Sequence, residues 1–237
     1  MLTLTTQKTL IMKNILTRVA FLTTFSLVAL LSISCTKDDS ISNADYYGQF
    51  NNSNINNQIA LLPKTAISDV EINGLLHMRE EEKLARDVYT TMYNKYGVKI
   101  FSNIYASEQT HMDALLQLLN KYAIADPVGT NAIGVFKDEA LQSLYNSLVS
   151  QGNLSILDAY KVGATIEDLD LYDLKVETAK VDNADIILVY QMLAKGSRNH
   201  MRAFYSSIRS LNGTYVPQFI TQAEFDAIIN SAMERGF

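Results

Sequence analysis

The chain has 237 residues, of which 48% are hydrophobic, and a formal net charge of −5, so it can bury a full core and lacks the basic surface that nucleic-acid binding requires. A single cysteine excludes a disulfide framework and a thiolate zinc cluster. Three prolines and ten glycines favour an all-α fold over a turn-rich β protein.

Residues 1–35 have the order of a secretory signal. Lys13 and Arg18 precede an apolar run over residues 19–31, and small residues follow as far as Cys35. The run is too short for a comfortable transmembrane helix. We therefore predict a signal segment that ends at the cysteine.

Cys35 resembles the lipobox cysteine of bacterial lipoproteins, which becomes the lipidated first residue after cleavage, although Ser32 stands where leucine is usual. The acidic pair Asp38 and Asp39 is similar to the signal that sends some Gram-negative lipoproteins to the cell surface. The resemblance implies lipidation at Cys35 and a membrane anchor in the cell envelope, at the outer membrane, with exposure at the surface. An ordinary signal peptide with an incidental thiol and an uncleaved anchor are the alternatives.

Residues 36–66 are polar and rich in asparagine. Little in this segment could build a core, so we predict a disordered tether. The folded domain is expected to occupy residues 67–237.

The first helix of the domain is predicted over residues 68–96. Ser68 and Glu71 form a capping box at its start, and Gly97 is suited to the position after its end. A stripe of residues spaced by three and four positions should face the core, and its one carboxylate is Glu82. Charged residues off this stripe are expected in solvent or in surface pairs: Glu80, Glu81, Lys83 and Arg86.

The second helix is predicted over residues 102–122. Steps of three and four positions connect Ile104, Glu108, His111, Leu115, Leu118 and Tyr122. Glu108 and His111 therefore lie in the middle of a core-facing stripe, where an ionised carboxylate needs a partner. Inward Glu-x-x-His pairs hold two-metal centres in helix bundles, so a metal ion is the partner we favour.

A loop over residues 123–136 and a short helix over 138–151 separate the second and third long helices. A crossover of this size is typical of the ferritin-like version of the four-helix bundle.

The third long helix is predicted to begin near Ser155, and its inward stripe carries Glu167 and Asp170. A break near Asp170 is left open, because a new turn can start at Asp173. Asp182 or Asn183 is expected to cap the fourth helix, which is predicted to end at about residue 211. His200 is the only strong metal ligand on its inward stripe. A final short helix opens with a second capping box at Thr221 and Glu224.

Four helices thus offer six inward-facing metal ligands: Glu82, Glu108, His111, Glu167, Asp170 and His200. Four carboxylates balance the charge of two divalent ions. Carboxylate and imidazole ligands favour iron, manganese or zinc over calcium or magnesium. We predict two metal ions, with iron as the first choice and manganese or zinc as alternatives.

Any one of these residues alone is more often a satisfied core polar group than a ligand, and only their joint placement favours metal. His77 lies off the stripe and is expected at the surface. Tyr89, Tyr160 and Tyr190 are expected to be core aromatics, with a hydrogen bond to a ligand as the alternative. Arg198 and Arg202 are expected in surface pairs or in support of His200.

These residues resemble two related families. The stretch EEKLARDVY is similar to the first-helix motif of rubrerythrins, in which the ligand glutamate aligns with Glu82, and ASEQTH is similar to their second-helix Glu-x-x-His. The motifs MREEEKLARDVY, GATIEDLDLYDL and GSRNHMRAF more closely resemble the proteins grouped as domain of unknown function 2202, over about residues 67–225. The resemblance implies a ferritin-like, rubrerythrin-related di-iron carboxylate protein.

One position departs from the general di-iron pattern. Most ferritin-like carboxylate proteins have glutamate three residues before the fourth-helix histidine, and this chain has Ser197 there. Asp170 or water would have to replace the missing carboxylate. The chain also lacks the cysteine-ligated iron domain of rubrerythrins.

The sequence therefore predicts an all-α, ferritin-like four-helix bundle with a long crossover that contains a short helix, and a short C-terminal helix. The first function considered is reduction of oxygen or peroxide at a di-iron centre. The alternatives are a non-catalytic metal-binding or iron-handling envelope protein and a metal-free helical interaction module. The catalytic residues are left unassigned, no organic cofactor or nucleic-acid partner is expected, and oligomerisation is left open.

Overall fold

The structure, a computed structural model, describes residues 52–235. Within this range all regular structure is helical, as the composition predicted. The helices are α3 Asn52–Leu61, α4 Asp69–Tyr96, α5 Lys99–Tyr122, α6 Glu139–Gly152, α7 Ile156–Thr178, α8 Ala184–Ser210 and α9 Gln222–Ile229. The predicted signal segment, Cys35 and the first part of the predicted tether lie outside the described residues.

The ends of α4 follow from local chemistry. The Ser68 hydroxyl accepts a hydrogen bond from the Glu71 amide at 3.3 Å, and the Glu71 carboxylate accepts one from the Ser68 amide at 2.9 Å. At the other end Gly97 has φ 66°, and its amide donates to the Tyr93 carbonyl. Both ends match the prediction, because a capping box and a left-handed glycine satisfy backbone groups that the helix leaves unpaired.

The remaining helix ends differ little from the prediction. Helix α5 begins three residues earlier than predicted, at Lys99. Ser155 caps α7, which continues without a break to Thr178, so the alternative of a break near Asp170 is not realised. A second capping box at Thr221 opens α9, also as predicted.

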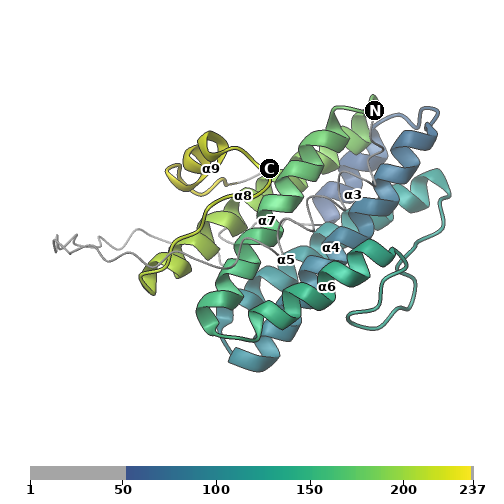
Figure 1. Ribbon diagram of the computed structural model, residues 1–237. Coiled ribbons are helices and arrows are strands. Elements are labelled where there is room, and N and C mark those ends of the chain that lie inside the picture. The colour runs from purple at the N-terminus through teal and green to yellow at the C-terminus, as the bar shows by residue number, and fades with distance from the viewer. Residues whose placement is uncertain (1–51, 236–237) are drawn as a thin grey trace, which may run out of the picture. The chain divides into compact units, whose positions relative to one another are not determined.

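The four long helices lie side by side (Figure 1). Helix α4 packs along α5 and α7 along α8, and further contacts join α4 to α7 and α5 to α8. Gly97 and Val98 alone separate α4 from α5, so these two helices run antiparallel. Helix α6 lies in the crossover from α5 to α7 and packs against α4 and α7. The C-terminal helix α9 packs on α8.

Two hydrophobic clusters fill the space between the long helices. One contains Tyr89 and Phe204, and the other contains Leu75. Along α5, Ile104 belongs to the first cluster and Leu115 to the second, so the turns between them lie between two apolar regions. This arrangement excludes water from the middle of the helices, where the predicted ligands lie.

Helix α3 corrects the prediction of a tether over residues 36–66. Ile55 and Ile59 are buried in the second hydrophobic cluster, and α3 packs against α5 and α8. The Lys121 side chain also donates to the Ile59 carbonyl at 2.8 Å. Two isoleucines four positions apart make one apolar stripe, and this short signal was obscured by the surrounding asparagines.

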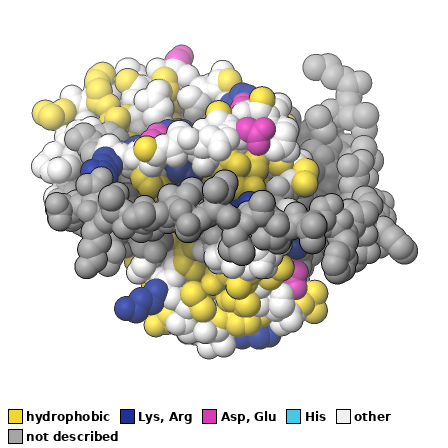
Figure 2. All heavy atoms as spheres, turned by 90° about the vertical axis from the view of Figure 1, so that its left-hand side faces the viewer, with side chains coloured by type: hydrophobic (Ala, Val, Ile, Leu, Met, Phe, Trp, Pro, Cys, Tyr) yellow, Lys and Arg dark blue, Asp and Glu magenta, His cyan; other side chains and the backbone are white. Residues whose placement is uncertain are grey.

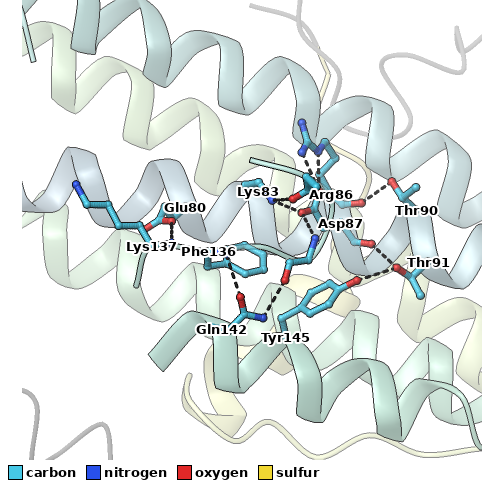
Figure 3. Close-up of polar contacts among 12 residues, drawn as sticks. Glu80, Lys83, Arg86, Asp87, Thr90, Thr91, Phe136, Lys137, Gln142 and Tyr145 are labelled. Carbon is cyan, nitrogen blue, oxygen red and sulfur yellow. Dashed lines mark hydrogen bonds and ion pairs between the residues drawn. The ribbon is translucent and has the colours of Figure 1, made fainter. Parts of the chain in front are cut away.

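A second correction concerns the charged residues of α4 that were expected at the surface. Glu80, Glu81 and Lys83 are buried, and Lys83 forms an ion pair with Asp87 one turn later (Figure 3). The crossover provides partners for Glu80 and Lys83, and the Lys83 ammonium donates to the Ala132 carbonyl at 2.9 Å. Helical periodicity cannot show that a loop remote in sequence covers this face.

Glu80 accepts hydrogen bonds from the amides of Lys137 and Asp138, at 2.6 Å and 3.0 Å (Figure 3). The Gly134 amide donates to Asp87 at 2.9 Å. These carboxylates of α4 therefore hold the loop that leads into α6.

Figure 2 shows one face of the molecule, on which lysine, arginine and acidic side chains are scattered and hydrophobic side chains gather toward the lower end. No histidine side chain is visible among the described atoms of this face. Among the described helices, none combines the length and the apolar character needed to cross a membrane.

Candidate metal centre

Five of the six predicted ligands come into contact in the middle of the long helices. They are Glu82 from α4, Glu108 and His111 from α5, Glu167 from α7 and His200 from α8. All five are at most 2% exposed. Four helices therefore converge on one dry, polar cluster, as the inward stripes predicted.

Glu108 occupies the centre of this cluster. Its Oε2 lies 2.9 Å from His111 Nδ1, and its Oε1 lies 3.0 Å from His200 Nδ1. Ligand atoms of the three residues all lie within 4.8 Å of one another, close enough to share an ion. One carboxylate thus faces both imidazoles, each with a different oxygen.

Glu82 and Glu167 complete the cluster on opposite sides. Glu82 Oε2 lies 3.1 Å from His111 Nδ1, and Glu167 Oε2 lies 3.3 Å from His200 Nδ1. Each imidazole nitrogen therefore faces one carboxylate of its own and the shared Glu108. The cluster is a pair of similar half-sites joined by Glu108.

Ser107 holds the far side of both imidazoles. Its Oγ lies 3.0 Å from His200 Nε2 and 3.4 Å from His111 Nε2. The two rings are stacked, with centroids 5.5 Å apart and an interplanar angle of 21°. A hydrogen bond at Nε2 fixes the orientation of an imidazole ring, so Ser107 would position both rings if their Nδ1 atoms held metal. Ser107 was not among the predicted site residues, although its place four residues before His111 on one helix is a usable signal.

Tyr89 holds Glu167. The buried phenol donates a hydrogen bond to Glu167 Oε1, which leaves Oε2 facing His200. The alternative in which one inward tyrosine bonds a candidate ligand is therefore realised at Tyr89. Burial, together with the Glu167 and Glu108 charges, raises the pKa of this phenol, so it stays a donor.

Asp170 lies at the edge of the cluster. Its Oδ2 accepts a hydrogen bond from Ser197, the residue that replaces the usual fourth-helix glutamate. Its Oδ1 is buried and has no hydrogen-bond partner. Serine at this position therefore leaves room for the α7 carboxylate and fixes one of its oxygens.

At the three central residues, neighbouring charges outweigh the effect of burial on the pKa. Burial would lower the pKa of His111, but the Glu82 and Glu108 charges raise it to about 9. Burial likewise opposes the charged form of His200, and the Glu108 and Glu167 charges raise the pKa of that imidazole. For Glu108, burial raises the pKa, but both imidazoles outweigh it and the net shift is downward.

The pKa values of the outer carboxyl groups are raised, because burial is the largest effect on each of them. Burial raises the pKa of Glu82 to about 8, although the His111 charge opposes this shift. Burial also raises the pKa of Glu167, and it raises that of Asp170 together with the Glu82 and Glu81 charges. Without a cation, the cluster therefore holds protons at neutral pH that a metal ion would displace.

The donor set fits a metal ion. Glu82 Oε1 and Asp170 Oδ1 are both buried without a hydrogen-bond partner. A buried carboxylate oxygen without a partner is costly, and native proteins rarely keep one without a reason. Imidazole nitrogens and carboxylate oxygens are suitable ligands for iron, manganese or zinc.

His77 corrects the prediction of a surface histidine. Its Nε2 lies 3.4 Å from Glu81 Oε2 and 3.5 Å from Asp173 Oδ2, and 19% of its side chain is exposed. The three residues form a second group whose ligand atoms lie within 4.8 Å of one another. Arg198 pairs with Glu234 near the surface, as expected, whereas Arg202 pairs with the same carboxylate but is buried.

The chain is similar in sequence to known proteins. Residues 71–232 match a family described as an uncharacterized protein domain, DUF2202. An uncharacterized protein of Methanocaldococcus jannaschii, MJ0754, is 55% identical over 178 residues, which are 75% of this chain and 96% of that protein.

The crystal structure of the hypothetical protein MJ0754 is similar in fold as well. It superposes with a TM-score of 0.72 and covers 73% of this chain and 99% of that chain. The candidate centre lies within the residues that match the family.

Proposed function

Because this chain belongs to the DUF2202 family and joins two imidazoles through one buried carboxylate, we propose that it is a ferritin-like protein that binds a pair of metal ions. The observation that carries the proposal is Glu108, whose two oxygens lie 2.9 Å and 3.0 Å from the Nδ1 atoms of His111 and His200. A carboxylate in this position would be a ligand shared by both metal ions.

Each half-site supplies its own ligands. Glu82, Glu108 and His111 would hold one ion, and Glu108, Glu167 and His200 would hold the other. The free oxygen of Asp170 would add a ligand where the usual fourth-helix glutamate is missing. The side-by-side long helices, the crossover through α6 and the Glu-x-x-His of α5 support the ferritin-like architecture.

Iron is the metal that we propose first, with manganese and zinc as alternatives. When bound, a ferrous pair would supply the two electrons that, with two protons, convert one hydrogen peroxide molecule to two water molecules. The chain itself excludes water with its two apolar clusters and orients the ligands through Ser107 and Tyr89. In the metal-free chain Glu82, whose pKa is raised to about 8, holds a proton that the incoming ion would displace.

Metal analysis of protein purified without added metal tests the proposal. We expect about two ions per chain, with anomalous scattering at the iron or manganese edge located between Glu108 and the two imidazoles. A cluster that stays empty after ferrous ion is added would show that it is a metal-free hydrogen-bond network. Stopped-flow oxidation of the ferrous form, with and without peroxide, then separates a redox enzyme from a protein that only stores or carries metal.

The pKa shifts predict how the stability of the metal-free protein depends on pH. The folded-state pKa of His111, about 9, lies above its ordinary value of 6.5, so its stabilising effect is complete below pH 6.5 and is lost as the pH rises through 9. The raised pKa of Glu82 acts in the same direction. We therefore expect the metal-free protein to lose stability between pH 6.5 and 9, as measured by urea unfolding.

Metal binding should show the opposite trend, because the ion displaces protons from these groups. We expect the affinity for ferrous or zinc ion to rise between pH 6.5 and 9, and calorimetry in buffers of different ionisation enthalpy to detect proton release. An affinity independent of pH over this range would contradict the assignment of these side chains as ligands.

We also propose that the protein is a lipoprotein of the cell envelope, attached through Cys35 and residues N-terminal to the domain. The order of charge, apolar run and cysteine in residues 1–35 supports this proposal. Expressed in a Gram-negative bacterium, the wild type should incorporate radiolabelled palmitate and fractionate with the outer membrane, and the Cys35→Ala variant should do neither. Equal labelling of both proteins would exclude this anchor.

A further inference from the structure

A second group of metal ligands lies outside the buried cluster. His77 and Glu81 are four residues apart on α4 and share one face, and Asp173 approaches them from α7. Glu81 and Asp173 are almost fully buried, whereas His77 is partly open to solvent. None of the three is a predicted ligand of the buried centre.

The spacing of these atoms is unusual for hydrogen bonds. His77 Nε2 lies 3.4 Å from Glu81 Oε2 and 3.5 Å from Asp173 Oδ2, whereas most hydrogen bonds from nitrogen to oxygen are about 2.9–3.0 Å long. Two ligand atoms bound tetrahedrally at about 2.1 Å from a zinc ion are separated by about 3.4 Å. The distances therefore match those of ligands around a shared tetrahedral ion.

Asp170, already assigned to the buried centre, lies next to this second group on α7. It precedes Asp173 by one turn of α7, and its Oδ1 is buried without a hydrogen-bond partner. Glu81 directly precedes Glu82 on α4, so the second group borders the buried centre on both helices. Carboxyl groups thus continue from the centre toward the partly exposed His77.

We propose that His77, Glu81 and Asp173 form a separate mononuclear site for a divalent cation of the zinc type. One imidazole nitrogen and two carboxylate oxygens supply three ligands, and water completes the tetrahedron from the solvent side of His77.

Zinc-edge anomalous diffraction from crystals of the full chain grown with Zn²⁺ tests this site directly. We expect a peak between His77, Glu81 and Asp173 in the wild type and no peak there in His77→Ala, with the buried centre unchanged. In solution, zinc titration of His77→Ala should lose one binding event or weaken it by at least about tenfold, the effect of removing even an outer partner of a ligand. Asp173→Asn should give the same loss, and the exposed Asp182→Asn provides a control of equal charge.

The outcomes separate this inference from the proposed function. Zinc in the buried centre but not beside His77 would overturn the second site and leave the first. Zinc beside His77 in a protein whose buried centre takes up neither zinc nor added ferrous ion would support the second site and overturn the first. Unchanged zinc binding in both His77→Ala and Asp173→Asn would also overturn the second site, with circular dichroism confirming that each variant is folded.

Discussion

Replacing the shared carboxylate, Glu108→Gln, is expected to abolish binding at both metal positions. Glutamine keeps the shape of the side chain but removes the charge that both imidazoles face, at 2.9 Å and 3.0 Å. Loss of an outer partner of a metal ligand weakens binding by about 10- to 100-fold, and loss of a bridging ligand should exceed about 100-fold at each position. Metal content after gel filtration and ferrous ion titration would measure this loss.

A matched control is Glu80→Gln, which changes another buried carboxylate of the same interior into an amide. Glu80 accepts hydrogen bonds from two crossover amides and has no part in the cluster, so this variant should keep its metal. Loss of only one of the two ions in Glu108→Gln would contradict a bridging role. Equal metal content in Glu108→Gln and wild type would contradict the whole centre.

The largest effect on stability is expected from Asp87→Ala. Asp87 pairs with Lys83, and both side chains are fully buried (Figure 3). It also accepts hydrogen bonds from Arg86 and from the Gly134 amide, at 2.8 Å and 2.9 Å. Removing one partner of a buried ion pair leaves the other charge buried without a counter-charge, which lowers the free energy of unfolding by about 3–5 kcal/mol. Each kcal/mol lowers the melting temperature of a domain of this size by about 2–4 °C.

The double variant Lys83→Met/Asp87→Ala tests the cause of this loss. It removes the stranded ammonium, so it should be more stable than Asp87→Ala alone. The exposed Asp226→Ala on α9 serves as a control and should lie within about 0.5 kcal/mol of the wild type. A single-variant loss below about 1 kcal/mol would mean that water or a rearranged crossover compensates Lys83.

Periodicity and capping were enough to locate the long helices of the described part of the chain. Ser68 and Gly97 bound α4 as predicted, because caps act through hydrogen bonds within a few residues. The inward position of Glu108 and His111 also follows from spacing on one helix. That four such stripes meet is a property of packing, yet it could be predicted because polar residues on apolar stripes must share a partner.

Contacts between segments remote in sequence could not be predicted in this way. Glu80 and Lys83 lie off the core stripe of α4 and become buried only because the crossover folds over them. Ile55 becomes part of the core only because α3 packs against α5 and α8. Burial of this kind depends on how a loop or short helix returns to the domain, which no local pattern encodes.

The amino-acid sequence by itself determined the long helices, their inward faces and the set of carboxylates and imidazoles that those faces carry. Only the tertiary structure decided that Glu108 lies between both imidazoles, that Ser107 orients them, and that His77 meets Glu81 and Asp173. The physical reason is that helix faces are set by local spacing and hydrophobicity, whereas contacts between side chains of different helices depend on the rotation and depth of packing of each helix.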